Sequence, residues 1–492
     1  MIAINARTLA ALPDRVIRPA YDRAAVTPGI AHLSVGNFHR AHQAVYLDRV
    51  LAQPGAAGWG ILGVGLVDDE RERAKAHALQ AQDGLYTLTE CPPDDAPTVR
   101  VIGSIVEYRH APADPEAVLA RLADPAIRIV TMTVTEGGYN TDETGRFKLE
   151  DPATARDLRE AVPRTAFGYL TEALRRRRDA GAGPFTVLSC DNLRHNGAVA
   201  RNALLSYADA KDAPLARWIE ANVAFPGCMV DRITPATLPA DAERLNAASG
   251  IADGAPVFAE DFIQWVLQDE FCAGRPALET VGVQITNDVD AYEQVKLRML
   301  NASHSTIAFP GILLGHRLVH LAMRDPMMHA LVEQFLRRDA APLLTAPPGM
   351  GLAAYADGLL RRYGNPAIGD QLLRIAGDGA SKLPVFVQDT ARALLAPGRD
   401  HRRIAFLLAA FTEYLRGVDD AGATFPVVEP HVSATDHALT AEADPAAALG
   451  MGVFAGWGLV AHPDFVADYA RMRRSIRADG ARATLAALLA ES

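Results

Sequence analysis

The sequence lacks the patterns that mark a metal centre or a disulfide framework. Its four cysteines, Cys91, Cys190, Cys228 and Cys272, lie far apart, and no two have the C-x-x-C spacing of zinc or redox motifs. No H-E-x-x-H pair occurs among the 14 histidines. We therefore expect free thiols in a reducing compartment and no bound metal.

Long apolar runs and an excess of positive charge are also missing. No stretch of about 18 uncharged apolar residues appears, which argues against a membrane span. Residues 1–21 carry early charges and no apolar core before a cleavage site, so they make a poor signal peptide. The formal net charge of −10 argues against binding to nucleic acid or to an anionic membrane. These features predict a cytoplasmic protein.

What is present is enough apolar sequence for large cores, since 49% of the 492 residues are hydrophobic. In the first part of the chain, continuous β-rich apolar runs alternate with helix-like segments. The runs occupy residues 30–36, 59–67, 99–108, 127–135 and 185–192. Such runs separated by helices indicate a parallel sheet covered on both faces. We therefore predict an α/β, doubly wound Rossmann-type domain over residues 1–286.

Helical periods dominate the rest of the chain, with glycine and proline between them. Segments such as IAFLLAAFTEYLRGV and FVADYARMRRSIRADG are typical of amphipathic or buried helices. These patterns predict a second, mainly α-helical domain over residues 287–492.

The segment SVGNFHRAH follows the first predicted strand. A glycine between a strand and a helix lets a phosphate approach the backbone. The full G-x-G-x-x-G fingerprint is absent, because Ser34 stands at the first glycine position and Asn37 and Phe38 follow Gly36. An ordinary strand-to-helix turn explains the pattern nearly as well. Arg40 and its neighbouring histidines could contact a diphosphate or merely cap the helix.

Acidic residues follow the second predicted strand, at Asp68, Asp69 and Glu70. A carboxylate here would accept hydrogen bonds from the adenosine ribose hydroxyls and repel a 2′-phosphate, which favours NAD over NADP. The separation from Gly36 is longer than the usual ~20 residues of the fingerprint. An acidic cap for the next helix explains these residues equally well.

The stretch KLRMLNASH places Lys296, Asn301 and His304 in a largely apolar, helix-like segment. At about 100° per residue, Asn301 lies about 140° and His304 about 80° round an α-helix from Lys296, so all three fit on one broad face. A lysine of lowered pKa can remove a hydroxyl proton, and an asparagine amide can donate to the oxygen that develops negative charge. A second amide, Asn192, ends a predicted strand, where ligands of such sheets bind. A solvated helix face would explain the helical triple alone more simply.

Several separate motifs, in the same order, resemble those of the polyol-specific long-chain dehydrogenases, and most closely the mannitol 2-dehydrogenases. They are GNFHRAHQ (36–43), TEGGY (135–139), SCDNLRHNG (189–197), MVDRITP (229–235), QWVL (264–267) and K-x-x-x-x-N-x-S-H (296–304). The resemblance covers nearly the whole chain. It implies a Rossmann-type domain, a mostly helical domain and an active site in the cleft between them. It also implies metal-independent, NAD(P)-linked oxidation of a polyol to a ketose.

The resemblance implies roles for particular residues. The catalytic set is the lysine Lys296, the two oxyanion-stabilising asparagines Asn192 and Asn301, His304, and Glu293 for proton movement. The substrate residues are Asp231 and Arg374. The cofactor residues are Val35, Gly36, Asn37, Phe38, Arg40, Asp69 and Glu70. Ser34 departs from the glycine that the family commonly has, and its side chain would crowd the cofactor diphosphate or donate a hydrogen bond to it.

The expected function is therefore NAD-dependent interconversion of a polyol and a ketose, first of all D-mannitol and D-fructose, with NADP the less favoured cofactor. The alternatives are an arabinitol or sorbitol dehydrogenase, a fructuronate (hexuronate) reductase and a dinucleotide sensor without turnover. The expected partner is a small-molecule polyol or ketose. A monomer is expected, because no heptad seam or isolated apolar tail points to an assembly.

Overall fold

A computed structural model of the chain describes residues 1–142 and 145–491. They form two compact units, which divide between Asp290 and Ala291. This division lies close to the predicted boundary between residues 286 and 287. Among the described residues, no helix has the length and apolar character needed to cross a membrane. All four cysteines are free thiols, and only Cys272 is exposed.

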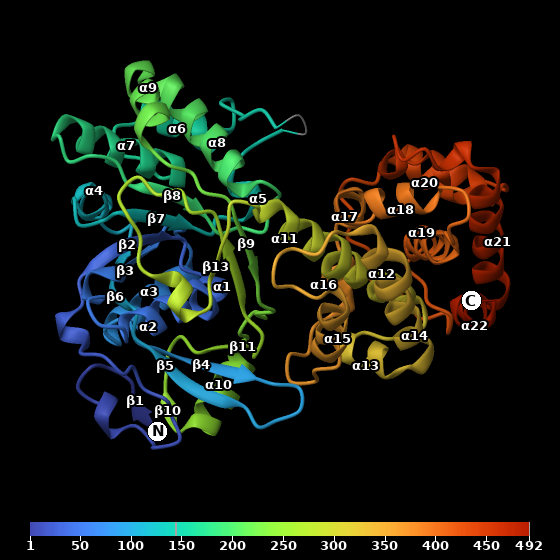
Figure 1. Cartoon of the computed structure of the whole chain (residues 1–492), viewed down its shortest axis with the longest axis horizontal. Helices are drawn as coiled ribbons and strands as arrows, with labels where there is room; N and C mark the ends of the chain where they lie inside the picture. The colour runs from blue at the N-terminus through green and yellow to red at the C-terminus, as the bar shows by residue number, and fades with distance from the viewer. Residues whose placement is uncertain (143–144, 492) are drawn as a thin grey trace. The chain divides into compact units, whose positions relative to one another are not determined.

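The first unit is built on a parallel sheet of five strands in the order β6–β3–β2–β7–β8 (Figure 1). The strands are β2 (Pro28–Leu33), β3 (Gly60–Gly65), β6 (Ile105–His110), β7 (Ile129–Met132) and β8 (Thr186–Ser189). The chain runs outward from β2 through β3 to β6, and then returns to the other side of β2 for β7 and β8. Ligands of open α/β sheets bind outside the carboxyl ends of the strands at such a switch point. The predicted doubly wound α/β fold is confirmed.

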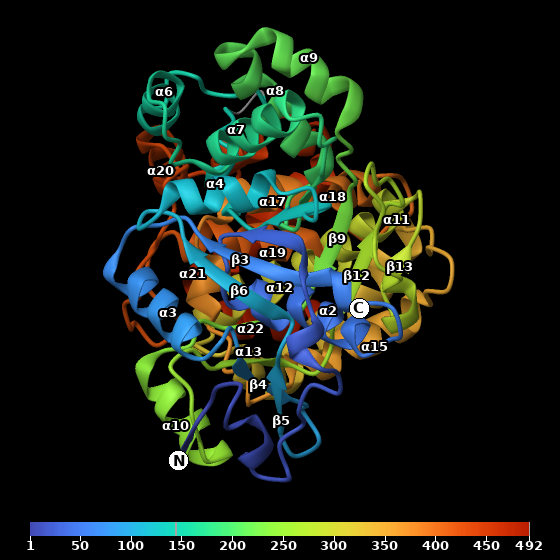
Figure 2. The same cartoon turned by 90° about the vertical axis from the view of Figure 1, so that its left-hand side faces the viewer.

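Alternate residues of these strands form two apolar cores, one on each face of the sheet. Ala31 and Leu33 of β2 belong to one core, whereas Ile30 belongs to the other. Because both faces are covered, each strand is a continuous apolar run. Figure 2 shows α3 beside the edge strand β6, with which it packs. The helices of this unit are α1 (Asn37–Ala41), α2 (Gln43–Leu51), α3 (Glu70–Ala81), α4 (Pro115–Ala123), α5 (Thr135–Gly138), α6 (Pro152–Arg159), α7 (Ala166–Asp179), α8 (Asn196–Lys211), α9 (Ala213–Asn222) and α10 (Pro239–Ser249).

Three small sheets complete the unit, in the orders β1–β10, β11–β4–β5 and β13–β12–β9. Their strands are β1 (Ile2–Ala3), β4 (Tyr86–Cys91), β5 (Thr98–Ile102), β9 (Cys228–Asp231), β10 (Ile251–Ala252), β11 (Val257–Glu260), β12 (Gln264–Leu267) and β13 (Gln284–Ile285).

The prediction of a single strand over residues 99–108 is wrong, because β5 ends and β6 begins within it, and the two strands belong to different sheets. The chain bends at Gly103. Its N–H donates to Asp48 (2.8 Å), and its carbonyl oxygen accepts from Arg23 (2.8 Å). A Cβ atom at Gly103 would lie 2.8 Å from Pro19. These side chains come from elsewhere in the chain, so the local apolar pattern does not reveal the break.

The second unit is helical, as predicted, and has a single large core. From Arg403 to Tyr414, every residue of α19 (Arg402–Tyr414) is buried. Phe411 of this helix packs edge-on against Phe309 of α12 (Ala302–Leu313) at 5.0 Å between ring centroids. The other main helices are α11 (Val289–Val295), α13 (Val319–Arg324), α14 (Pro326–Gln334), α15 (Leu352–Tyr363), α16 (Leu372–Ala376), α17 (Gly379–Phe386), α18 (Gln388–Leu394), α20 (Ala434–Ala441), α21 (Pro463–Asp479) and α22 (Ala481–Ala490).

Candidate active site

The turn that follows β2 combines a strained residue with an open glycine. Ser34 has a φ of +67°, in the left-handed region that glycine adopts most readily. Its N–H donates to Val64 of β3 (2.8 Å), and its carbonyl oxygen accepts from Thr133 (3.0 Å). A Cβ atom at Gly36 would meet no atom closer than the Ser34 carbonyl oxygen, at 4.0 Å. This turn therefore leaves room for a cofactor diphosphate to approach the backbone.

The neighbouring predicted cofactor residues lie deeper in the protein. Val35 is fully buried, so its backbone alone is available to a ligand. Arg40 is 3% exposed, and its guanidinium donates to the Ala255 carbonyl oxygen and to Asn37 Oδ1 (2.7 Å). Burial lowers the pKa of Arg40. Phe38 stacks on the imidazole ring of His42, with 4.9 Å between the ring centroids. These contacts favour a structural role for Arg40 over direct contact with a diphosphate.

The acidic residues after β3 lie beside this turn, because β2 and β3 are paired and parallel. Asp69 is the N-cap of α3, where its carboxylate accepts from the Glu72 N–H at 2.7 Å. Asp69 and Glu70 are both exposed. The alternative of an acidic helix cap is therefore realised for Asp69. An exposed carboxylate at this edge of the sheet remains able to accept from ribose hydroxyls.

Two polar residues of the predicted site lie at other strand ends of the first unit. Asn192 is exposed in the turn after β8. Asp231 is 5% exposed at the end of β9, where it pairs with Gln264 of β12. Cys228 at the start of β9 donates to the carbonyl oxygen of Ser189 (3.0 Å), which ties β9 to the end of β8.

The expectation of a regular α-helix over residues 296–304 is wrong for its first two-thirds. Residues Lys296–Asn301 form a π-helix, η5, between α11 and α12. The N–H of Ala302 reaches back five residues to the Leu297 carbonyl oxygen. The angles derived for an α-helix therefore do not apply to Lys296 and Asn301. Wide turns of this kind occur frequently at functional sites.

Burial separates Lys296 from the solvated lysines of an ordinary helix face. Lys296 is 7% exposed, and Glu293, one turn earlier, is 6% exposed. Asn301 and His304 are half-buried. The Oδ1 atom of Asn301 is buried and has no hydrogen-bond partner among the described residues, which suits it to accept from a ligand hydroxyl. The second unit thus brings an amine, a carboxylate and an amide into one helical segment.

Tyr363 of α15 supports this segment from the side. Its hydroxyl donates to the Leu300 carbonyl oxygen (3.1 Å) and lies 2.7 Å from the Ser303 hydroxyl. Its ring is 5.0 Å from that of His304. Arg374 of α16 lies at the surface, with 66% of its side chain exposed, in a bidentate pair with Asp370 (2.7 and 2.8 Å).

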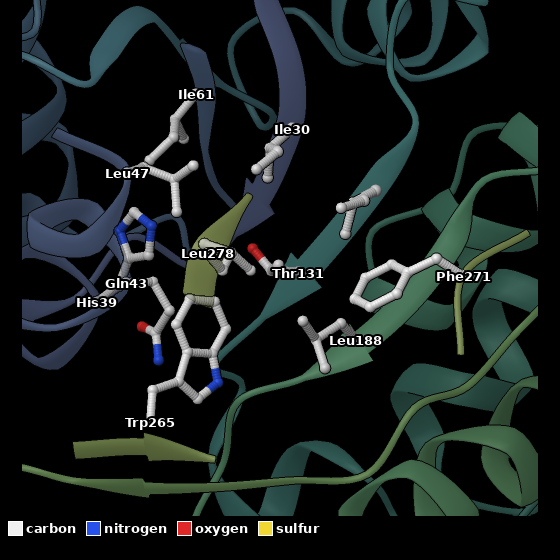
Figure 3. A pocket seen from close by; sticks show the side chains of 11 residues that line it. Ile30, His39, Gln43, Leu47, Ile61, Thr131, Leu188, Trp265, Phe271 and Leu278 are labelled. Atoms are coloured by element: carbon white, nitrogen blue, oxygen red, sulfur yellow. The ribbon is translucent and has the colours of Figure 1, made fainter. Parts of the chain in front are cut away.

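A small apolar cavity between the sheet and α2 is too small to be a substrate site. Figure 3 shows His39, Gln43 and Trp265 on one side of it and Leu188 and Phe271 on the other. The space open to the centre of a water molecule is about 10 Å³. That is about the volume one water needs, far below a typical ligand pocket of about 300 Å³ or more.

The sequence interpretation missed a buried carboxylate, Asp191, which accepts hydrogen bonds from two consecutive N–H groups, those of Val134 and Thr135 (2.9 Å each). It assigned no role to His32 and did not predict that this buried imidazole stacks on that of His39, with ring centroids 3.5 Å apart. Asp191 stands directly before Asn192, and Thr135 begins the TEGGY motif. The position of Asp191 next to Asn192 was the only signal in the sequence. Its contact with the TEGGY motif could not be predicted, because it depends on β7 and β8 being neighbours in the sheet.

Comparison with known proteins agrees with this arrangement. Residues 28–280 match the family model for the mannitol dehydrogenase Rossmann domain, and residues 288–476 match that for the mannitol dehydrogenase C-terminal domain. The chain is similar to the polyol:NADP oxidoreductase of Gluconobacter oxydans (strain 621H), with 49% identity over 486 residues, 98% of this chain and 100% of that protein.

Two solved structures are similar over the full length. The crystal structure of D-sorbitol dehydrogenase in substrate-free form has a TM-score of 0.93 and 48% identity, covering 99% of this chain and 100% of that one. Pseudomonas fluorescens mannitol 2-dehydrogenase, in a ternary complex with NAD and D-mannitol, has a TM-score of 0.87 and 42% identity, covering 100% of each. Since both domains of one family match in order across most of its length, this chain belongs to the mannitol dehydrogenase family of polyol oxidoreductases.

Proposed function

We propose that this chain interconverts D-mannitol and D-fructose by metal-independent hydride transfer, with NAD as the preferred cofactor. The burial of Lys296 in a π-helical turn that ends at Asn301 is the observation that carries the proposal. Burial is the condition under which a lysine can serve as an acid or base near neutral pH. A lysine that only solubilised a helix would be exposed.

In the proposed mechanism, uncharged Lys296 removes the proton from the hydroxyl group that is being oxidised. The amide N–H groups of Asn192 and Asn301 donate to the same oxygen as negative charge develops on it. Glu293, one turn before Lys296, passes the proton onward, and His304 holds a second hydroxyl or orients the lysine. In ketose reduction, protonated Lys296 returns its proton to the carbonyl oxygen. A nicotinamide ring bound beside the substrate would take up the hydride released from carbon.

The residues after β2 and β3 fit a dinucleotide. The open face of Gly36 would admit the diphosphate, and the exposed Asp69 would accept from the adenosine ribose. This carboxylate also supports the proposed preference for NAD, because it would repel a 2′-phosphate. The similarity to an enzyme named for NADP makes this preference a matter for direct measurement.

Other polyols are the second candidate. The similarity to a D-sorbitol dehydrogenase supports sorbitol as a substrate. Arabinitol is one carbon shorter and also offers secondary hydroxyls for oxidation. A hexuronate such as fructuronate would need a cation for its carboxylate. Arg374 is already paired with Asp370, and Arg40 is buried, so neither favours this substrate. A sensor without turnover would have no use for a buried lysine.

A panel of polyols and ketoses, assayed with both nicotinamide cofactors, tests the proposal. Oxidation of D-mannitol with NAD, and reduction of D-fructose with NADH, should give the highest kcat/KM. A clear preference for D-sorbitol, or for fructuronate over fructose, would replace the proposed substrate. Absence of turnover on every compound, together with tight NADH binding, would overturn the enzymatic proposal.

A further inference from the structure

Asp191 joins two turns at the carboxyl edge of the sheet. Asp191 is 8% exposed, and its carboxylate accepts from the Val134 and Thr135 N–H groups, at 2.9 Å each. It also accepts from the Tyr139 hydroxyl at 2.7 Å. The donors lie after β7, whereas Asp191 lies after β8. The carboxylate therefore fixes the separation between two neighbouring strand ends.

The hydrogen-bond directions around this carboxylate leave little freedom. Backbone N–H groups can only donate, so both carboxylate oxygens of Asp191 must accept. The Tyr139 hydroxyl uses its hydrogen on Asp191 and so accepts from the buried Ser189 hydroxyl, which it contacts closely. An amide in place of the carboxylate would turn an NH₂ group toward at least one of these donors.

The turn that Asp191 holds is strained. Thr135 has a φ of +63°, which is rare for a β-branched side chain. Such a conformation persists only where surrounding contacts determine it, and strained residues cluster at functional sites. The Asp191 carboxylate accepts hydrogen bonds from the N–H groups of Val134 and Thr135, and these contacts hold Thr135 in its strained conformation.

The same cluster reaches the residues proposed to bind substrate and cofactor. Asn192 is the next residue after Asp191, and the Asp191 carbonyl oxygen accepts from Asn196 of α8 (3.1 Å). On the other side, Thr133 donates to the Ser34 carbonyl oxygen in the turn after β2. Asp191 thus links the turn after β8 to the turn after β7, and Thr133 links the end of β7 to the turn after β2.

We propose that Asp191 is a positioning residue for hydride transfer, which acts through Asn192 by locking the β8 turn to the strained Thr135 turn. The inference rests on the proposed function, because Asn192 is given its role there. Asp191 itself contacts neither substrate nor cofactor in this account. Its loss should therefore lower kcat more than it raises KM, and the effect should depend on Asn192.

The test is a double-mutant cycle with Asp191→Asn and Asn192→Ala in the full-length protein. Asp191→Asn alone should lower kcat about 10- to 100-fold, whereas in the Asn192→Ala background it should lower kcat less than about threefold. Tyr139→Phe, which removes one of three donors, should give a smaller effect in the same direction. Asp157→Asn is the matched control, because Asp157 is also buried and accepts from two consecutive N–H groups, those of Arg164 and Thr165.

The inference would be overturned if Asp191→Asn lowered kcat by the same factor with and without Asn192→Ala. It would also be overturned if Asp157→Asn lowered kcat as much as Asp191→Asn does. Hydrogen exchange gives a second measurement that needs no turnover. Asp191→Asn should accelerate exchange of the Val134 and Thr135 amides and of the 190–193 turn, and Asp157→Asn should not. Unchanged exchange at both turns in Asp191→Asn would show that Asp191 does not hold the two turns together. Wild-type inactivity on every polyol would refute the proposed function, while the exchange data would still decide whether Asp191 holds the turns.

Discussion

Thr133 donates a hydrogen bond of 3.0 Å to the carbonyl oxygen of Ser34, and so joins the end of β7 to the strained turn after β2. Because the hydroxyl hydrogen is used in this bond, Thr133 must accept from His32 Nε2, which lies 3.0 Å away. His32 Nδ1 lies 2.7 Å from the Thr131 hydroxyl on the other side of the ring. Burial lowers the pKa of His32, which favours the neutral ring, and the contact with Thr133 then places its proton on Nε2.

This relationship predicts how Ser34 responds to substitution. Ser34→Gly should keep the free energy of unfolding within about 1 kcal/mol of the wild type, because glycine adopts a φ of +67° without strain. Ser34→Val should lower it by about 1–3 kcal/mol, since a β-branched side chain strongly disfavours this region. Urea unfolding measures both, with Ser206→Val on the regular helix α8 as the control. Equal stability of the two Ser34 variants would show that the turn is not held at this φ.

The buried imidazoles predict a pH dependence of stability. Burial lowers the pKa of His32 to about 3 and that of His39 well below its ordinary value. In the unfolded chain both protonate below about pH 6.5, so only the unfolded state gains protons as the pH falls from about 6.5 toward 3. Stability is lost over this window, and His32 alone accounts for about 2 kcal/mol at pH 5.

His32→Gln should therefore shrink the difference in unfolding free energy between pH 7.5 and pH 5 by about 2 kcal/mol. His77→Gln is the control, because His77 is exposed and should leave the difference unchanged. Urea midpoints at the two pH values give the measurement. If the unfolding free energy of His32→Gln falls between pH 7.5 and pH 5 by as much as that of the wild type, His32 does not titrate in this window.

Asp69 can be tested as a cofactor residue separately from its role as a cap. Asp69→Ser keeps a good N-cap for α3 but removes the charge. It should raise the ratio of kcat/KM for NADP over NAD by about fivefold, as expected for removing a repulsion of about 1 kcal/mol. Asp69→Ala should raise the same ratio but also lose about 1 kcal/mol of stability with the cap. An unchanged ratio in both variants, as in the control Asp68→Ala, would leave Asp69 as a helix cap only.

The strands of the central sheet could be predicted, because both of their faces are buried and each strand is therefore a continuous apolar run. The break at Gly103 could not, since Asp48, Arg23 and Pro19 impose it from other parts of the chain. The burial of Arg40 has the same origin, because its partner Ala255 is 215 positions away. The local sequence shows the periodicity of a segment, but it does not show which distant residues contact that segment.

The candidate site shows the same division. Lys296, Asn301 and His304 were selected by residue type and spacing, and Asn192 by its place at the end of a predicted strand. The π-helical turn could not be predicted, because Leu297, Met299 and Leu300 are all buried, so the segment has no clear polar face whose shift would mark an extra residue. Asp191 was missed because its role depends on β7 and β8 being neighbours in the sheet.

The central claim is that Lys296 is the acid and base of polyol oxidation, and the kcat of Lys296→Ala with D-mannitol and NAD tests it most directly. Turnover should fall about 10²- to 10⁴-fold, the range for a positioned acid–base group, while NADH binding stays unchanged. Lys211→Ala, which removes an exposed lysine from α8 of the first unit, is the control. Turnover of Lys296→Ala within a few-fold of the wild type would contradict the account.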